Sequence, residues 1–173
     1  TPLRKGGVLA VGDSFTAGSE VGDGETWPAY LEQRLGIPVL NAAAGGWASD
    51  QIVLRAESLI EPLAPKAIVV SFLSEDIVRA SYRVFSGGSK PYFTVENGGL
   101  TAHNIPVEPF AGRSDEIGRL RGLLGHSILI AKAMEAIGRS DWWYKSTSSI
   151  RVDNDYAAVS CLLLERLKRR ADA

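Results

Sequence analysis

The chain has 173 residues, of which 45% are hydrophobic and 23% charged, and these proportions suit one globular domain with a sizeable core. The net charge of −1 argues against an electrostatic nucleic-acid binder, and no apolar run is long enough to span a bilayer. The single cysteine, Cys161, excludes an internal disulfide framework and leaves cytoplasm and periplasm both open. Because Cys161 lies in an apolar helical stretch, we expect a buried, inert thiol.

The first half of the chain alternates between two kinds of segment. Short apolar runs are typical of buried parallel strands, at residues 8–11, 38–41 and 67–72. A helix over residues 26–35 is predicted from Pro28, which suits a first turn, and from Gly36, which suits the position after a helix end. A second helix, capped by Ser49 or Asp50, precedes the third run. This alternation indicates an α/β layered fold with a parallel sheet.

The second half departs from this pattern. Residues 91–107 predict a β-hairpin with its turn at Asn97-Gly98-Gly99, which we interpret as an insertion over the α/β core. A long helix is predicted over residues 114–137. A last helix is capped by Asp153 or Asn154. It turns one apolar face inward, formed by Leu163, Leu164 and Leu167.

The end of the chain bears on the completeness of the fold. No strand is predicted after the last helix, although in a doubly wound domain such a helix usually leads back into the sheet. The predicted parallel strands also make a thin sheet. We therefore expect residues 1–173 to form a single α/β domain that is incomplete at its C-terminal end. The alternative is that a partner chain or a separate fragment completes the sheet.

A small-polar loop follows the first predicted strand. Gly12-Asp13-Ser14 lies at the carboxyl end of a parallel strand, where open α/β sheets bind their ligands. A serine on such a turn is exposed, and nearby backbone N–H groups point toward an anion, as a nucleophile that creates an oxyanion requires. A tight turn capped by Asp13 or Ser14 is the structural alternative for this tripeptide taken alone.

Three segments in order, each after a predicted strand, carry a family resemblance. Gly12 to Gly18 resembles the first sequence block of the SGNH (GDSL-like) hydrolases, and Asn41 to Gly46 resembles their second block. The segment Phe72-Leu73-Ser74-Glu75-Asp76 lies where the family has Gly-x-Asn-Asp. A further stretch, residues 24–28, is similar to bacterial SGNH-like proteins. The resemblance covers roughly residues 7–79 and implies a three-layer, flavodoxin-like SGNH fold with a parallel sheet, to which the hairpin is added.

The resemblance also implies roles for individual residues. Ser14 is the nucleophile that attacks an ester carbonyl. The backbone N–H groups of Ser14 and Gly46 form the oxyanion hole, with Gly45 one residue out of register. Asp13 orients the loop, and Asp76 matches the aspartate of the third block.

Two departures from the family pattern stand out. Glu75 occupies the place of the third block's asparagine, and an ionised carboxylate accepts hydrogen bonds where an oxyanion needs a donor. Burial that protonates Glu75, a side chain turned away, different chemistry, and simple capping of the next helix by Glu75 and Asp76 all stay open. The family's last block, Asp-x-x-His, has no counterpart, because neither His103 nor His126 has an aspartate three residues before it. We expect His103 to be an exposed strand residue and His126 to pack within a helix.

These observations favour a serine esterase that acts on a small-molecule or carbohydrate ester through an acyl-Ser14 intermediate, with no cofactor and no metal. An O-acyltransferase is the closest variant. A non-catalytic SGNH-like module that binds a ligand or glycan is the alternative from a different class, and Glu75 favours it. An unrelated flavodoxin-like domain that binds an anion at the Ser14 loop is a third reading. The sequence does not decide the oligomeric state.

Overall fold

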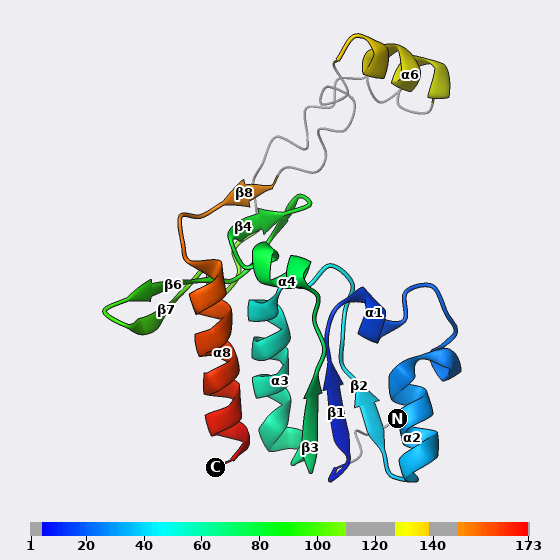
Figure 1. Ribbon diagram of the computed structural model, residues 1–173, viewed down its shortest axis with the longest axis vertical. Helices are drawn as coiled ribbons and strands as arrows, with labels where there is room; N and C mark the ends of the chain where they lie inside the picture. The colour runs from blue at the N-terminus through cyan, green and yellow to red at the C-terminus, as the bar shows by residue number, and fades with distance from the viewer. Residues whose placement is uncertain (1–4, 110–126, 139–148, 173) are drawn as a thin grey trace.

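The computed structural model describes residues 5–109, 127–138 and 149–172. Its centre is a three-stranded parallel sheet in the order β2-β1-β3, formed by β1 (Val8–Val11), β2 (Val39–Asn41) and β3 (Ala67–Val70). The strands lie side by side in Figure 1, at the positions that the sequence predicted. Because β1 is the middle strand, all four of its residues are buried, whereas β3 alternates between exposed and half-buried residues.

Two helices complete the crossovers between these strands. α2 (Trp27–Leu35) lies beside β2, and it is closed by Gly36 in the left-handed conformation, as predicted. α3 (Ser49–Leu63) packs on β1 and contributes several buried apolar side chains to the core. The predicted cap of α3 was wrong: Ala48 is the cap residue, and Ser49 and Asp50 are buried in the first turn. Both side chains bond to segments far along the chain, and Asp50 in addition accepts the N–H of Gln51 in its own helix.

The start of α2 gives a stability prediction. Thr26 is buried, and its hydroxyl accepts the N–H of Ala29 at 3.3 Å and donates to the carbonyl of Asp23 at 3.3 Å. We expect Thr26→Ala to lower the free energy of unfolding by about 0.5–2 kcal/mol, because a helix N–H loses its acceptor. Thr26→Ser keeps the hydroxyl and should lose much less. Urea unfolding followed by circular dichroism measures both variants, and equal losses would contradict a capping role.

The insertion after the third strand is larger than predicted. α4 (Ser74–Arg79) leads into β4 (Tyr82–Phe85), which pairs antiparallel with β5 (Gly88–Ser89) and with β8 (Ile150–Arg151). The predicted hairpin is confirmed as β6 (Tyr92–Glu96) and β7 (Gly99–His103). The small sheet of β5, β4 and β8 was missed, because strands of two to four residues leave no periodic signal.

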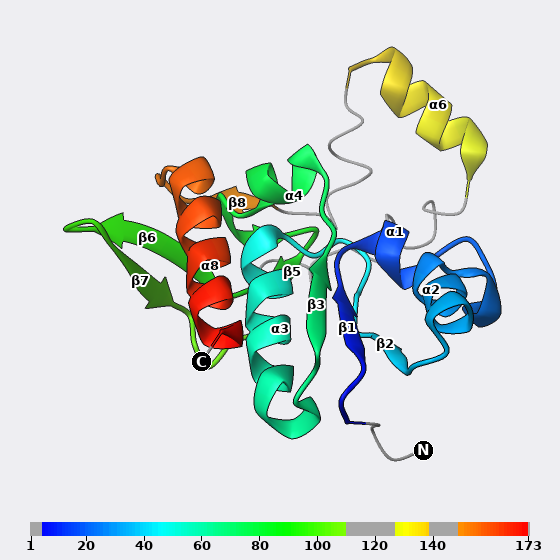
Figure 2. The same cartoon turned by 60° about the horizontal axis from the view of Figure 1, so that its bottom comes forward.

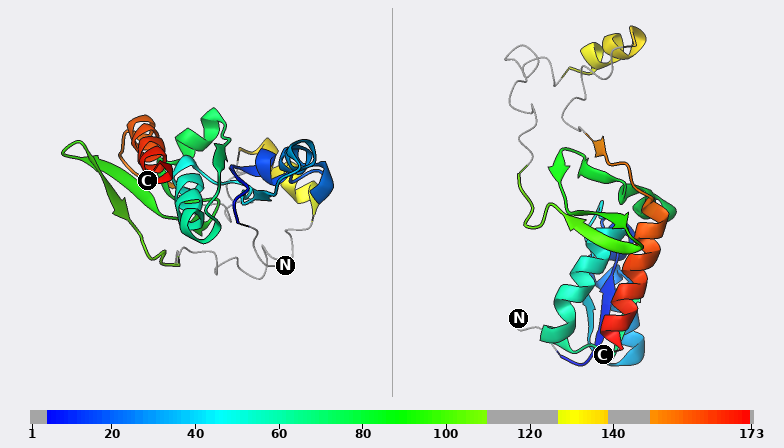
Figure 3. Two further views of the ribbon diagram at one scale, coloured as in Figure 1. Left: turned by 90° about the horizontal axis from the view of Figure 1, so that it is seen from below. Right: turned by 90° about the vertical axis from the view of Figure 1, so that its left-hand side faces the viewer.

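The last helix, α8 (Tyr156–Ala171), packs beside α3 in Figure 2 and beside the hairpin in Figure 3. Leu163 and Leu167 are buried and Leu164 packs partly against the core, as predicted. The cap is Asp155, one residue beyond the predicted pair Asp153 and Asn154. Asn154 instead donates to the carbonyls of Ala80 and Phe93, and this ties α8 to the ends of α4 and β6.

The prediction for Cys161 was wrong, because its thiol is exposed. Cys161 is two positions from Leu163, which corresponds to about 200° around a helix of 3.6 residues per turn. The side of α8 that buries Leu163 therefore turns Cys161 toward solvent. The apolar residues next to Cys161 in the sequence therefore did not place its thiol in the apolar core.

Of the long helix predicted over residues 114–137, the structure describes α6 (Ile128–Ala136), which is capped by the Ser127 hydroxyl. The earlier part of that prediction, including His126, lies outside the described residues. α6 exposes large apolar side chains, among them Ile128 and Leu129. Within the described ranges, the helices are either too short or too polar to cross a membrane.

Candidate active site

The loop after β1 positions Ser14. Asp13 is buried and caps the short helix α1 (Ser14–Ala17) by accepting the N–H of Phe15 at 3.0 Å. Gly18 closes α1 in the left-handed conformation, and its N–H donates to the Ser14 carbonyl at 2.9 Å. Ser14 is therefore the first residue of a tightly closed turn at the carboxyl end of the central strand, and it is partly exposed to solvent.

Contacts with α2, with the end of β2 and with the residue after β3 hold this loop in place. Gly12 has no room for a Cβ, which would overlap Thr16 Oγ1 and lie 2.7 Å from the carbonyl oxygen of Ser71 after β3. The Thr16 hydroxyl accepts the indole N–H of Trp27 at 3.4 Å. The Thr16 carbonyl accepts from Asn41 Nδ2 at 2.8 Å, at the end of β2. The loop is thus anchored on both neighbouring strands and on α2.

The loop after β2 lies against Ser14. Ala44 N–H donates to the Gly12 carbonyl at 3.3 Å, which joins the two loops directly. A Cβ built on Gly45 would lie 3.7 Å from Ser14 Cβ, so Gly45 is the residue of this loop whose α-carbon faces the Ser14 side chain. Gly46 follows with φ +77°, a conformation that L side chains rarely adopt. Within the described part of the chain, the N–H groups of Ser14 and Gly46 donate to no protein acceptor.

The loop after β3 brings a second buried carboxyl group to the same edge of the sheet. Asp76 is fully buried in the first turn of α4, where it accepts the N–H of Leu73 at 2.8 Å and pairs with Arg79 at 2.6 Å. Burial raises the pKa of Asp76, and the negative charge of Asp13 raises it further, while the Leu73 N–H and Arg79 oppose the shift. Glu75 is exposed on the same turn, so the alternative in which this side chain is buried is wrong.

Comparison with known proteins identifies the family to which this arrangement of loops belongs. The model of the GDSL-like lipase/acylhydrolase family matches residues 8–97, which is more than half of the chain and includes all three loops. The chain belongs to this family. No curated protein shows significant similarity to the chain as a whole.

Solved structures give a weaker likeness. The crystal structure of AlinE4, described as an SGNH-hydrolase family esterase, is 29% identical with a TM-score of 0.38. Two AlinE4 mutants are 28% and 27% identical with the same TM-score. In each case the match covers 44% of this chain and 44% of the other, so the chain spans less than half the length of these esterases.

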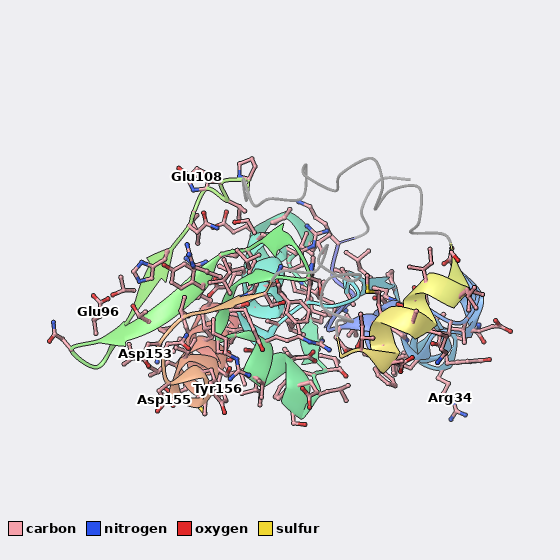
Figure 4. All side chains as sticks on the ribbon, turned by 90° about the horizontal axis from the view of Figure 1, so that it is seen from above. Arg34, Glu96, Glu108, Asp153, Asp155 and Tyr156 are labelled. Atoms are coloured by element: carbon pink, nitrogen blue, oxygen red, sulfur yellow. The ribbon has the colours of Figure 1, made fainter. Side chains whose placement is uncertain are left out.

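The GDSL-like site has no histidine partner among the described residues. His103 lies in β7, where Nε2 is 2.8 Å from the Thr94 hydroxyl and the ring stacks on Tyr92 at 4.8 Å between centroids. The side chain is half-buried, not exposed as predicted, because Tyr92 covers one face of its ring. The hairpin and α1 lie on opposite sides of the molecule in Figure 1, and Figure 4 likewise separates Glu96 on the hairpin from Arg34 on α2.

A buried ion pair in the first turn of α3 gave no signal in the sequence. Lys90 Nζ lies 2.6 Å from Asp50 Oδ2 and donates to the carbonyl of Tyr82 at 3.0 Å, and both charged side chains are buried. Burial raises the pKa of Asp50 to about 6, with Lys90 opposing the shift, and burial lowers the pKa of Lys90. The pair joins the start of α3, which follows the Gly46 loop, to the segment between β5 and β6. A lone lysine between Ser89 and Pro91 gave no signal of this partner.

Proposed function

We propose that this protein is a serine esterase in which Ser14 becomes acylated by a small-molecule or carbohydrate ester. The observation that carries the proposal is the meeting of two loops: Ser14 opens α1 at the end of the central strand, and Gly45 lies against its side chain. Membership in the GDSL-like lipase/acylhydrolase family supports the same reaction class.

The proposed reaction has two half-reactions. Ser14 Oγ attacks the acyl carbon, a new C–O bond forms, and the carbonyl oxygen becomes negative. The N–H groups of Ser14 and Gly46 donate to this oxyanion. The bond to the alcohol breaks, and the proton lost by Ser14 passes through a base to the leaving oxygen. Water then attacks the acyl-serine in the same way and releases the carboxylic acid, whereas a sugar hydroxyl in place of water would make the protein an acyltransferase.

Two features limit the proposed rate. Glu75 stands where the family has a donor, and it is exposed on α4, so the proposed oxyanion hole consists of the two backbone N–H groups. The loss of one such donor in another hydrolase costs about 2.7–4 kcal/mol of transition-state stabilisation. The base is not His103, whose ring is engaged by Thr94 and Tyr92. His103 is the one histidine among the described residues, so we expect little or no turnover from the part of the chain that the structure describes.

A second candidate is a non-catalytic SGNH-like module that binds a ligand or glycan at the same loops. Glu75 is the observation that favours it, because an exposed carboxylate at the donor position opposes an oxyanion but not a neutral hydroxyl group. In this case Ser14 would donate or accept a hydrogen bond and would never be acylated.

Release of p-nitrophenol from p-nitrophenyl acetate separates the two candidates. The esterase predicts a burst of about one equivalent per chain, because p-nitrophenolate leaves without taking up a proton, so acylation depends less on a base than hydrolysis of the acyl-serine does. Ser14→Ala should abolish the burst, and Ser58→Ala, which changes an exposed serine on α3 away from the site, should leave it unchanged. Equal release by the wild-type protein and Ser14→Ala would remove Ser14 from the chemistry and favour the binding module.

A further inference from the structure

The surface beside Ser14 is hollowed. A depression of about 280 Å³ is lined by Ser14, Phe15, Gly18, Ser19, Glu20 and Val21. All of its lining comes from α1 and the residues that follow it. The serine hydroxyl and the depression therefore belong to one short segment, and a group bonded to Ser14 can lie in it without any rearrangement of the fold.

The depression is walled by large apolar side chains that face solvent. Phe15 is 71% exposed and Val21 is 51% exposed, although Phe15 lies next to Ser14 and the backbone N–H of Val21 is bonded to the Gly18 carbonyl. Exposed apolar surface that adjoins a polar reaction centre is a common feature of ligand-binding clefts. Burying these two side chains under an apolar group would recover the hydrophobic free energy that is lost by their exposure.

Backbone hydrogen bonds fix the shape of this wall. Ser19 N–H donates to the Ser14 carbonyl at 3.2 Å, and Val21 N–H donates to the Gly18 carbonyl at 3.2 Å. A Cβ on Gly18 would overlap the side chain of Thr26, so the segment is also packed against the start of α2. The depression is thus preformed, which lowers the conformational entropy lost when a ligand binds.

The charge of the lining restricts the ligand. Glu20 contributes an exposed carboxylate, and among the described residues the lining has no basic side chain. A ligand with its own carboxylate or phosphate at this place would meet like charge without a compensating cation. The lining therefore suits an aliphatic group and disfavours an anionic one.

We propose that this depression is the acyl subsite: it receives the short, uncharged aliphatic chain of the ester's acid component. The inference rests on the proposed acylation of Ser14, because the acyl chain is the part of the ester that stays bonded to Ser14 between the two half-reactions. A volume of about 280 Å³ lies at the small end of ligand pockets, so the chain is short. Phe15 and Val21 then determine specificity, and Glu20 excludes acyl groups that end in a carboxylate.

The first test compares burst rate constants for p-nitrophenyl acetate, butyrate and hexanoate. Full burial of a methylene corresponds to about fourfold in affinity, and an open depression should give about twofold per methylene. Phe15→Ser and Val21→Ser should flatten this increase. Leu35→Ser is the matched control, because Leu35 is 50% exposed at the end of α2, and it should behave as the wild-type protein does. Rates that are independent of chain length, or unchanged in Phe15→Ser, would overturn the proposal.

The second test uses charge. The p-nitrophenyl monoester of glutaric acid carries a carboxylate at the end of a short chain, and we expect it to acylate Ser14 more slowly than the uncharged butyrate. Glu20→Gln should raise the rate for the charged ester relative to the rate for butyrate by about twofold, because exposed charges act on each other only modestly. If Glu20→Gln leaves the ratio of the two rates unchanged, Glu20 has no part in specificity.

A binding measurement keeps the acyl subsite testable if acylation fails. Hexanamide carries the aliphatic chain, and its amide group is far less reactive than an ester. Its binding to Ser14→Ala is measured by saturation-transfer nuclear magnetic resonance. We expect transfer to the chain protons, strongly reduced by adding Phe15→Ser and retained on adding Leu35→Ser. If no burst occurs but hexanamide binding depends on Phe15, the proposed esterase activity is contradicted and the apolar subsite is supported. If a burst occurs but neither the binding nor the chain-length series depends on Phe15, the esterase activity is supported and the subsite is contradicted.

Discussion

Replacing Lys90 by methionine is expected to lower the free energy of unfolding by about 3–5 kcal/mol, the typical cost of removing one partner from a buried ion pair. The ammonium lies 2.6 Å from Asp50 Oδ2, and both side chains are buried. Methionine fills a similar volume but leaves the carboxylate without its counter-charge. The remaining partner of Asp50 is the N–H of Gln51, at 2.7 Å from Oδ1.

The loss should depend on pH in a direction that follows from the Asp50 pKa. Burial already raises this pKa from 3.8 to about 6 in the folded protein, and Lys90 holds it down, so Lys90→Met raises it further. A carboxyl group whose pKa is higher in the folded state stabilises the fold below its unfolded pKa, and the stabilisation is lost as pH rises through the folded pKa. The variant should therefore be closer to the wild-type protein at pH about 5 than at pH about 8. Chemical unfolding at both pH values measures this.

Two controls isolate the ion pair. Lys168→Met removes an ammonium of similar geometry, 2.7 Å from Asp172, but 79% exposed, and it should change stability much less than Lys90→Met does. Adding Asp50→Asn to Lys90→Met removes the stranded charge and should restore much of the loss. An equal loss for Lys168→Met, or no recovery in the double variant, would contradict a buried charge as the cause.

Gly12→Ala is expected to damage both stability and the site. The added methyl group would overlap the Thr16 side chain and lie 2.7 Å from the Ser71 carbonyl oxygen, and a backbone carbonyl next to a strand has little freedom to move. Overpacking of this kind costs about 1–3 kcal/mol. Because Gly12 precedes Asp13 and Ser14 directly, the strain should move the nucleophile, and a misplacement near 1 Å can lower a rate by about 100-fold.

Gly24→Ala is the matched control for this prediction. A Cβ on Gly24 meets nothing within 4 Å, so the same substitution should leave stability within about 0.5 kcal/mol and the burst rate unchanged. Thermal unfolding and the p-nitrophenyl acetate burst are measured on both variants. A Gly12→Ala protein with wild-type stability and burst rate would show that the loops around Ser14 tolerate a side chain there.

The sequence predicted the elements whose signals are local. The central strands are continuous apolar runs, and α2 carries Pro28 and Gly36 at its two ends, so their positions needed no tertiary information. The cap of α3 was misplaced for the opposite reason. Ser49 and Asp50 are good capping residues, but their side chains bond to Ser160 and Lys90, which are 111 and 40 residues away in sequence. Tertiary contacts overrode the local preference, and no pattern within a short window reports them.

The candidate site was predictable only in part. Parallel strands end at one edge of a sheet, so the sequence alone brought Ser14, the Gly46 loop and Asp76 to the same place. The contact between Gly45 and the Ser14 side chain, and the two apolar side chains beside it, depend on loop conformations that backbone bonds from Ala44 and Ser19 fix. The exposure of Glu75, at the place of the family's asparagine, likewise came from the structure and contrasts with the burial of its neighbour Asp76.

The most direct test of the account is the position of the acetyl group after reaction with p-nitrophenyl acetate. The protein is quenched in acid during the burst, digested, and its peptides are fragmented in a mass spectrometer. We predict one acetyl group on Ser14, absent from Ser14→Ala and formed more slowly in Gly12→Ala. Acetylation spread over Ser19 and surface lysines at equal rates in the wild-type protein and in Ser14→Ala, with none on Ser14, would contradict Ser14 as the nucleophile.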